Sequence, residues 1–309
     1  LQGAAGEGVA LSSTLVFDHP TARQLAAVLQ PRADEVLRLA AGSRPDSHDA
    51  PTDTPISISG LSALLPFGAA SPCAMISAIA CCTTAISEVP STRWDVHQSA
   101  VALREPVASR VRHGGFVIGS ELVDNAAFSV APAEAAAMDP QQRLLLEYGY
   151  AALHNATLER LALGGSLSGV FLGIASTEFA LVLTSSPAGA SVYAATGSSL
   201  SIASGRLSYV LGLHGPCVSY DTACSAALVA CHAGLRALQL DECVTGLVAG
   251  ITLMLAPGTG TSFAIAGMTS ARGRSHTFDA RADGYVRGEG CGAIALSRRR
   301  GQRPEAPGL

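Results

Sequence analysis

The stretch Pro216–Ala230 reads PCVSYDTACSAALVA, and the expected fold is built around it. It begins as a short apolar run in which Val218 and Tyr220 favour a strand, and it continues as an alanine-rich segment that favours a helix. The change falls at Cys224. At the first turn of a helix, unpaired backbone N–H groups and the positive end of the helix dipole favour a thiolate over a thiol. The pattern therefore predicts a nucleophilic cysteine where a strand passes into a helix.

A free cysteine is most often a buried, unreactive apolar residue, and Cys224 taken alone would be interpreted in that way. Its neighbours change the interpretation. The motif DTACS at 221–225 resembles the nucleophile motif of the β-ketoacyl synthases, or ketosynthases, which are the condensing enzymes of fatty acid and polyketide synthesis. The resemblance implies that Cys224 is the catalytic residue that accepts an acyl group.

A second stretch carries the same resemblance. Residues 274–292 read RSHTFDARADGYVRGEGCG, and the resemblance implies that Phe278 stands near the nucleophile and shapes the acyl and malonyl position. A phenylalanine that only fills a core would need no such role. The alternate glycines are similar to a nucleotide-binding loop, but no strand–glycine–helix order surrounds them, because Ala293–Leu296 continues as a strand. A nucleotide site is therefore excluded.

Several further patterns predict local structure. MDPQQR at 138–143, which also occurs in ketosynthases, predicts a helix start with Asp139 as N-cap, Pro140 in the first turn and Gln142 reaching back to the cap. Residues 71–86 predict an apolar helix. Residues 169–174 and 246–255 are apolar runs typical of strands buried on both faces. From residue 224 to about residue 240, small residues occur on every side, which predicts a helix buried all round.

The resemblance covers about residues 55–297 and implies an α/β, thiolase-like fold with layered αβαβα order. The chain is expected to contain mainly the N-terminal half of a ketosynthase domain. Such a half would expose an apolar face that normally packs centrally. We therefore expect the chain to aggregate, or to be poorly soluble, on its own.

The predicted domain order has three parts. Residues 1–30 are expected to be the C-terminal end of an acyl carrier protein domain, a short all-α remnant, because STLVFDHPT at 13–21 resembles the last part of such carriers and a capping box follows at 21–24. In that family the serine that carries phosphopantetheine would lie upstream of Leu1. Residues 31–54 are rich in proline, glycine, serine and aspartate and are expected to form a linker. Residues 55–309 are expected to be a ketosynthase domain truncated at its C-terminal side.

Composition excludes several other functions. The formal net charge of −4, with scattered basic residues, gives no reason to expect a nucleic-acid partner. All 20 basic residues are arginine, so lysine Schiff-base chemistry and a Walker phosphate loop are excluded. The eight cysteines contain no Cys-x-x-Cys pair, so neither zinc nor a disulfide framework is expected. No apolar run approaches the roughly 18 residues of a membrane span. We expect an intracellular, cytoplasmic protein with no metal and no directly bound cofactor.

The resemblance implies an acyltransferase of the 3-oxoacyl-[acyl-carrier-protein] synthase type. Cys224 would take an acyl group from phosphopantetheine and extend it by decarboxylative condensation with a malonyl-type thioester. The expected partners are acyl carrier protein domains, acyl and malonyl thioesters and, for the intact domain, a second copy of itself. The alternative from another functional class is a non-catalytic docking or scaffold module. A cysteine hydrolase is disfavoured because the Gly-x-nucleophile-x-Gly elbow is absent.

Condensation also needs donors for the enolate and the oxyanion, commonly two histidines and backbone N–H groups. His232 lies eight residues along the predicted helix, about 12 Å of axial rise from Cys224. His214 precedes the predicted strand, about 20 Å away if extended. In the family, both active-site histidines belong to later phrases that this chain does not contain. We therefore expect the isolated segment to be inactive in condensation.

Overall fold

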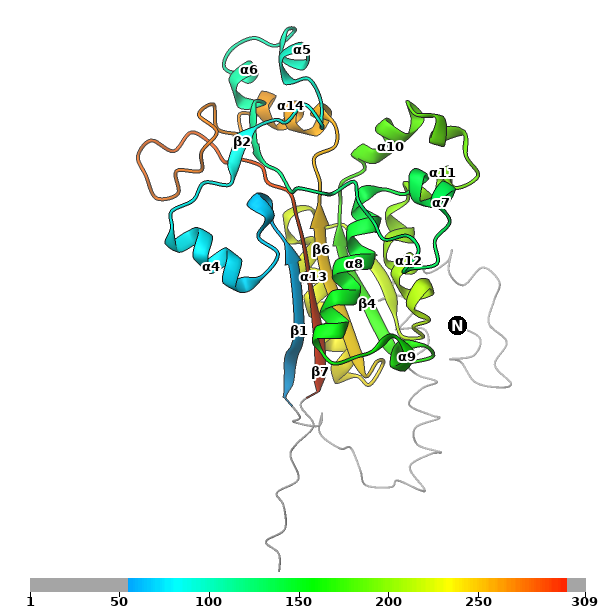
Figure 1. The fold of residues 1–309 in the computed structure, drawn as a ribbon. Helices are drawn as coiled ribbons and strands as arrows, with labels where there is room; N and C mark the ends of the chain where they lie inside the picture. The colour runs from blue at the N-terminus through cyan, green and yellow to red at the C-terminus, as the bar shows by residue number, and fades with distance from the viewer. Residues whose placement is uncertain (1–54, 299–309) are drawn as a thin grey trace, which may run out of the picture. The chain divides into compact units, whose positions relative to one another are not determined.

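The structure is a computed structural model that describes residues 55–298. The predicted carrier-protein remnant at 1–30 and the predicted linker at 31–54 lie outside the described residues. Five strands form one sheet, in the order β1 (Ile56–Leu64), β7 (Gly290–Arg298), β6 (Thr245–Thr252), β4 (Ser168–Ile174) and β5 (Cys217–Tyr220) (Figure 1).

The middle of this sheet is parallel. Strand β4 pairs in parallel with β5 and β6, with Val170 opposite both Cys217 and Leu247. Strand β7 is antiparallel to β6 and to β1. Every residue of β4 is buried, which confirms the predicted two-sided core strand.

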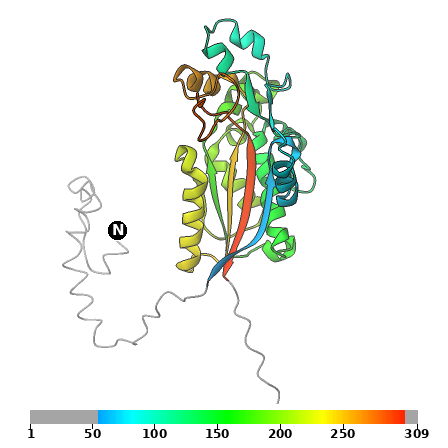
Figure 2. The same cartoon turned by 90° about the vertical axis from the view of Figure 1, so that its left-hand side faces the viewer.

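Helices cover both faces of the sheet. Helices α8 (Pro140–Asn155) and α12 (Leu200–Leu211) lie on one face, and α13 (Ala226–Gln239) lies on the other, as the two views in Figures 1 and 2 show. The larger core cluster, which includes Leu145 and Leu207, fills the first interface. The second interface contains Phe171, Ala230 and Val248. This helix–sheet–helix order gives an α/β fold with successive layers.

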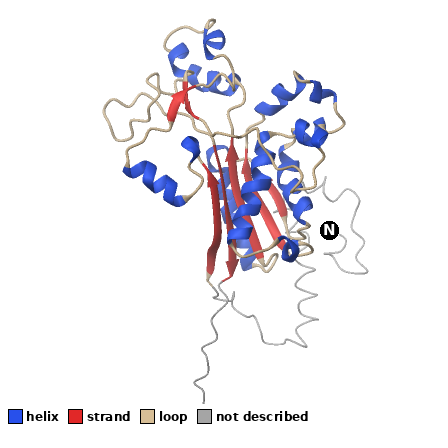
Figure 3. Ribbon diagram, in the orientation of Figure 1, coloured by secondary structure: helices blue, strands red, loops and turns tan. Residues whose placement is uncertain are grey.

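Shorter elements surround the sheet (Figure 3). Strands β2 (Ile86–Glu88) and β3 (His113–Gly115) form a small antiparallel pair. The remaining elements are η1 (Pro66–Gly68), α4 (Pro72–Ala80), α5 (Val96–Ala100), α6 (Val107–Arg110), α7 (Pro132–Ala137), α9 (Arg160–Leu163), α10 (Glu178–Thr184), η2 (Pro187–Ala190), α11 (Ala194–Gly197), η3 (Ala223–Ser225) and α14 (Pro257–Ile265). Within residues 55–298, no helix combines the length and apolarity needed to cross a membrane.

The predicted helix over 71–86 is too long. Helix α4 ends at Ala80, and Cys82 has a φ of 50°, in the left-handed region that a helix interior does not use. The chain then enters β2, where Ile86 pairs with Gly115. The prediction failed because the strand partner lies far away in the sequence, while the apolar composition alone favoured continuing the helix.

The start of α8 is mostly as predicted. Asp139 is the N-cap and accepts hydrogen bonds from the backbone N–H of Gln141 at 2.8 Å and from its side-chain amide at 3.0 Å. The prediction for Gln142 is wrong: its amide donates to the Gly197 carbonyl at 3.0 Å, and its oxygen accepts from Arg206 at 2.7 Å. The side chain binds a distant segment because it is buried, where no water can satisfy the amide.

One buried carboxylate joins four segments that are distant in the sequence. Glu289 lies immediately before β7 and forms an ion pair of 3.0 Å with Arg93. It also accepts from the backbone N–H groups of Val117 at 2.8 Å and Met254 at 2.9 Å. Its side chain has no solvent-exposed area, and every bond that it makes is charge-assisted. This network fixes where the chain returns to the sheet.

Replacing Glu289 should therefore be costly. Glu289→Gln removes the charge that compensates the buried Arg93 guanidinium, so we expect a loss of about 3–5 kcal/mol in the free energy of unfolding. Urea denaturation measures the loss. The control is Glu159→Gln, which alters an exposed pair with His154 and should cost about 1 kcal/mol or less. Equal losses in the two variants would contradict the assigned role of Glu289.

Asp139 gives a pH-dependent prediction. Burial raises the pKa of Asp139 from 3.8 to about 6, although the hydrogen bonds from Gln141 and the charge of Arg143 oppose the rise. Because the native state holds this proton more tightly than the unfolded chain, its contribution to stability is present below the unfolded pKa and is lost as the pH rises through about 6.

Asp139→Asn keeps a capping oxygen and removes this titration. As the pH rises from about 4 to about 8, the wild type should lose about 3 kcal/mol of unfolding free energy relative to the variant. Urea titrations across this range measure the difference, with Asp95→Asn at the exposed N-cap of α5 as the matched control. A difference that stays constant or rises with pH would refute the assignment.

Candidate active site

The structure confirms the predicted junction at Cys224. Strand β5 ends at Tyr220, the turn η3 holds Cys224, and α13 begins at Ala226. Ala223 has a φ of 52°, a left-handed conformation that costs about 1 kcal/mol or more for a residue with a side chain. Strained backbone therefore immediately precedes the cysteine. Such strain concentrates at functional sites. Six other described residues besides glycine also have a positive φ, so the strain at Ala223 agrees with the prediction for Cys224 but does not select it.

The polar residues around Cys224 hold the turn in place. The Asp221 carboxylate accepts from the Ala223 N–H at 3.1 Å. The Ser225 hydroxyl donates to the Thr222 carbonyl at 2.8 Å and lies 3.0 Å from the Thr222 hydroxyl. These local bonds compensate part of the strain at Ala223. The other residues of the DTACS motif thus shape the backbone that presents the sulfur.

Close packing sets the position of α13. A Cβ added to Gly173 of β4 would lie 2.4 Å from the backbone nitrogen of Ala227. One added to Gly250 of β6 would lie 2.8 Å from the Ala227 Cβ. The first turn of α13 therefore rests almost directly on the backbone of two strands. Sequence reasoning noted the small residues of the helix but missed these two glycines of the facing strands.

Cys224 is exposed, and so is the outer side of α13. The prediction that this helix is buried all round is wrong for the described residues. Its buried positions, all on the sheet side, are Ala226, Ala230, Gly234, Ala237 and Leu238. Leu228, on the opposite side, is 73% exposed. The reason is that, among residues 55–298, α13 packs mainly against the strands of the sheet, on one side of the helix (Figure 2).

Phe278 belongs to the same edge of the sheet as Cys224. The carboxyl ends of β4, β5 and β6 share one edge, and the segment 266–289 enters the antiparallel β7 from that edge (Figure 1). Phe278 lies in this segment with a φ of 65° and a relative exposure of 105%. Its ring is thus free of packing contacts, and the structure does not bring it against Cys224.

The histidines are placed as the spacing predicted. His214 precedes β5, at the opposite edge of the sheet from Cys224, and His232 is exposed two turns along α13. Among residues 55–298, no histidine is hydrogen-bonded to the turn that carries Cys224. The same residues contain no group of three or more histidine, cysteine, aspartate or glutamate side chains placed to hold a metal ion.

Comparison with known proteins identifies the arrangement. The family described as "Beta-ketoacyl synthase, N-terminal domain" matches residues 53–301. The chain belongs to this family. The sheet with its exposed cysteine turn is therefore the first part of a ketosynthase domain, and the thiolase-like fold expected from the sequence is confirmed.

Its relatives are modular polyketide synthases. The spectinabilin polyketide synthase system protein NorA' of Streptomyces orinoci is 40% identical over 94% of this chain, and the pikromycin polyketide synthase component PikAII of Streptomyces venezuelae is 39% identical over 94%. The match covers 8% of each of these relatives. The chain thus spans a small part of the length of these two relatives.

Solved ketosynthase domains share the fold. The ketosynthase from module 6 of the bacillaene synthase of Bacillus subtilis 168 superposes with a TM-score of 0.69 at 34% identity, over 79% of this chain and 40% of that chain. The oxazolomycin ketosynthase domain OzmH KS7 of Streptomyces albus JA3453 gives 0.71 at 29% identity, over 79% and 42%. The chain thus spans well under half of each solved ketosynthase.

The packing of α13 can be tested at Gly173. Gly173→Ala places a methyl group against the backbone of Ala227, so we expect a loss of about 3 kcal/mol in the free energy of unfolding. Gly292→Ala in β7 is the matched control, because a Cβ there meets no atom within 4 Å. Urea denaturation compares the two variants. Equal stability of both would show that α13 does not depend on contact with β4.

Proposed function

We propose that the chain is the nucleophile-bearing part of a β-ketoacyl-[acyl-carrier-protein] synthase in a modular polyketide synthase. The observation that carries this proposal is the position of Cys224: an exposed turn, preceded by a strained residue, between the edge strand β5 and the helix α13. Because Cys224 is exposed, a thioester can reach its sulfur. The sheet beneath the turn holds the sulfur in a fixed position.

The chemistry assigned to Cys224 has two steps. Its thiolate attacks the carbonyl carbon of an acyl thioester, and the phosphopantetheine thiol of an acyl carrier protein leaves, which forms an acyl-enzyme. A malonyl-type thioester then loses carbon dioxide, and the resulting enolate attacks the acyl carbon. The Cys224 thiolate is released, and the product is a β-ketoacyl thioester on the carrier. Phe278, at the same sheet edge, is proposed to shape the acyl and malonyl position once other parts of the domain cover it.

The enolate and the oxyanion need donors that the described residues do not place beside Cys224. We infer that two histidines come from a further part of the polypeptide. Two observations support this inference: the chain covers only 40% of a solved ketosynthase, and Leu228 on the outer side of α13 is 73% exposed. Condensation by the 309 residues alone is therefore not expected.

Partners follow from the same reasoning. We infer that residues 1–30 end a carrier domain, that residues 31–54 link it to the ketosynthase, and that carrier-bound thioesters are the substrates. A homodimer of the intact domain is also proposed. It is supported by β5, which is the last strand of the sheet, pairs only with β4 among the described strands, and exposes Val218. An unpaired strand edge is a natural surface for a second copy.

Acylation of Cys224 is directly testable. The complete ketosynthase domain, obtained by extending the coding sequence past Leu309, is incubated with a radiolabelled acyl thioester. We expect label on the wild type and on Cys217→Ala, an exposed cysteine of β5 that serves as control. Cys224→Ala should carry at least 100-fold less label, because it lacks the attacking sulfur.

Two results would overturn the proposal. Equal labelling of Cys224→Ala would show that another residue accepts the acyl group. An extended reading frame without histidines, together with no labelling of the wild type, would favour the non-catalytic docking or scaffold module.

A further inference from the structure

The buried start of α8 is bonded to the segment that follows β4. The Asp139 carboxylate accepts from the backbone N–H of Gln141 at 2.8 Å through Oδ1 and from its side-chain Nε2 at 3.0 Å through Oδ2. The same Nε2 donates to the Ser176 carbonyl at 3.0 Å. Both hydrogens of this amide are therefore used, one toward Asp139 and one toward Ser176.

The oxygen of the Gln141 side chain has no partner. Gln141 has no exposed surface, and its Oε1 receives no hydrogen bond from any group within residues 55–298. Buried polar groups are almost always paired in folded proteins. The neighbouring carboxylate is also unfavourable, because burial raises the pKa of Asp139 to about 6. One proton on Oδ2 would remove the buried charge and would create an O–H donor for the amide oxygen.

The charges around Asp139 do not replace this proton. Arg143, one turn along α8, lowers the pKa of Asp139, but burial has the larger effect. The other charged side chains on the surrounding elements act on Arg143 or form ion pairs of their own. They are Glu121 before α7, Glu134 on α7, Glu178 on α10 and Arg206 on α12.

We propose that Asp139 and Gln141 form a pH-dependent switch that holds residues 175–177, the connection between β4 and α10, near neutral pH and releases it in acid. When Oδ2 of Asp139 takes a proton from the solvent, the Gln141 amide rotates so that Oε1 accepts from the new O–H. Nε2 then points away from Ser176, whose carbonyl loses its donor. Because Oε1 now faces that carbonyl, two acceptors repel each other and the connection moves away.

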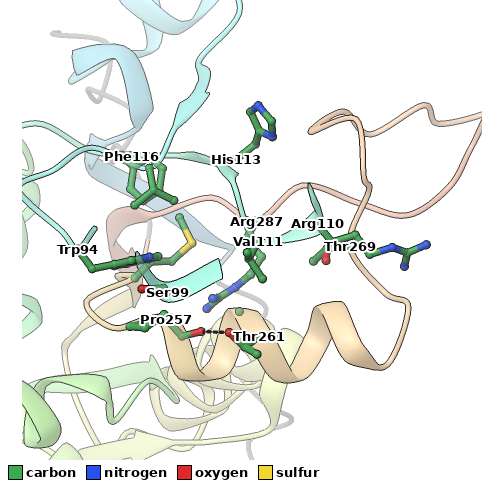
Figure 4. Close-up of a pocket in the computed structure, with 13 residues that line it drawn as sticks. Trp94, Ser99, Arg110, Val111, His113, Phe116, Pro257, Thr261, Thr269 and Arg287 are labelled. Carbon is green, nitrogen blue, oxygen red and sulfur yellow. Dashed lines mark hydrogen bonds between the residues drawn. The ribbon is translucent and has the colours of Figure 1, made fainter. Parts of the chain in front are cut away.

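The connection 175–177 lies at the carboxyl ends of β4 and β6. The Ser176 hydroxyl donates to the carbonyl of Leu253, the first residue after β6, at 3.3 Å. These strand ends belong to the sheet edge that also carries the turn of Cys224. Release of Ser176 therefore loosens part of this edge in acid. The cavity drawn in Figure 4, between β3, α6 and α14, is a separate feature, because none of these residues lines it.

Hydrogen exchange of the 309-residue chain in dilute solution, measured by mass spectrometry, tests the switch. Exchange is compared at about pH 5 and about pH 7.5, after division by the intrinsic rate at each pH. In the wild type, peptides covering 173–181 should be about fivefold less protected in acid, because one hydrogen bond is lost. Peptides covering 291–297 of β7 are the internal reference. They should keep their protection, because protonation of Asp139 stabilises the native state as a whole.

Two variants assign the effect to the switch. In Asp139→Asn, the side-chain amide donates to Oε1 of Gln141 as the protonated acid would, so protection of 173–181 should be low at both pH values. Gln141→Met cannot donate to Ser176 and should give the same result, which keeps the test valid if Asp139→Asn does not fold. Asp95→Asn, at the exposed N-cap of α5, is the matched control and should behave as the wild type.

Three results would contradict the switch. The first is equal protection of 173–181 at the two pH values in the wild type. The second is a pH effect that persists in Asp139→Asn or in Gln141→Met. The third is a loss of protection in 291–297 as large as that in 173–181, because acid would then destabilise the whole fold.

Discussion

The contact between the first turn of α13 and the backbone of β4 and β6 is the constraint on which the site depends. Because Gly173 and Gly250 have no side chains, Ala227 can rest on the sheet itself. The turn before it must therefore change direction within a few residues, and the left-handed conformation of Ala223 makes that change. The exposed position of Cys224 follows from close packing beneath it, and the local bonds of Asp221 and Ser225 make the turn rigid.

The position of the segment 266–289, which contains Phe278, depends on a buried charge. Glu289 binds Arg93 and two backbone N–H groups, and it is the last residue of this segment before β7. Glu178 plays a related part nearby, because its carboxylate accepts from the backbone N–H groups of Leu255 and Ala256 just before α14. Both carboxylates satisfy backbone groups where strands end, at the edge that also carries Cys224. The sheet supplies a rigid base, and these ionic contacts position the loops above it.

Local patterns in the sequence were sufficient wherever neighbouring residues decide the structure. The strand-to-helix change at Cys224, the N-cap at Asp139 and the buried strand β4 were all predicted correctly. The family followed from short motifs and is confirmed.

Features that depend on distant residues were missed. The end of α4 depends on pairing between β2 and β3, and the bonds of Gln142 reach more than fifty residues along the chain. The exposed side of α13 depends on what packs against it, which periodicity does not report.

The Glu289 network has a consequence for biosynthesis. Arg93 and Glu289 are separated by 196 positions, so the arginine leaves the ribosome long before its counter-ion exists. At translation rates of about 5–20 residues per second, the delay is roughly 10–40 s. Strand β1 waits longer still for β7, its one neighbour in the sheet among the described strands, because even the nearest pair, Leu64 and Cys291, is 227 positions apart. During that interval β1 can pack against α8, but its backbone groups have no partner strand in the sheet until β7 is made.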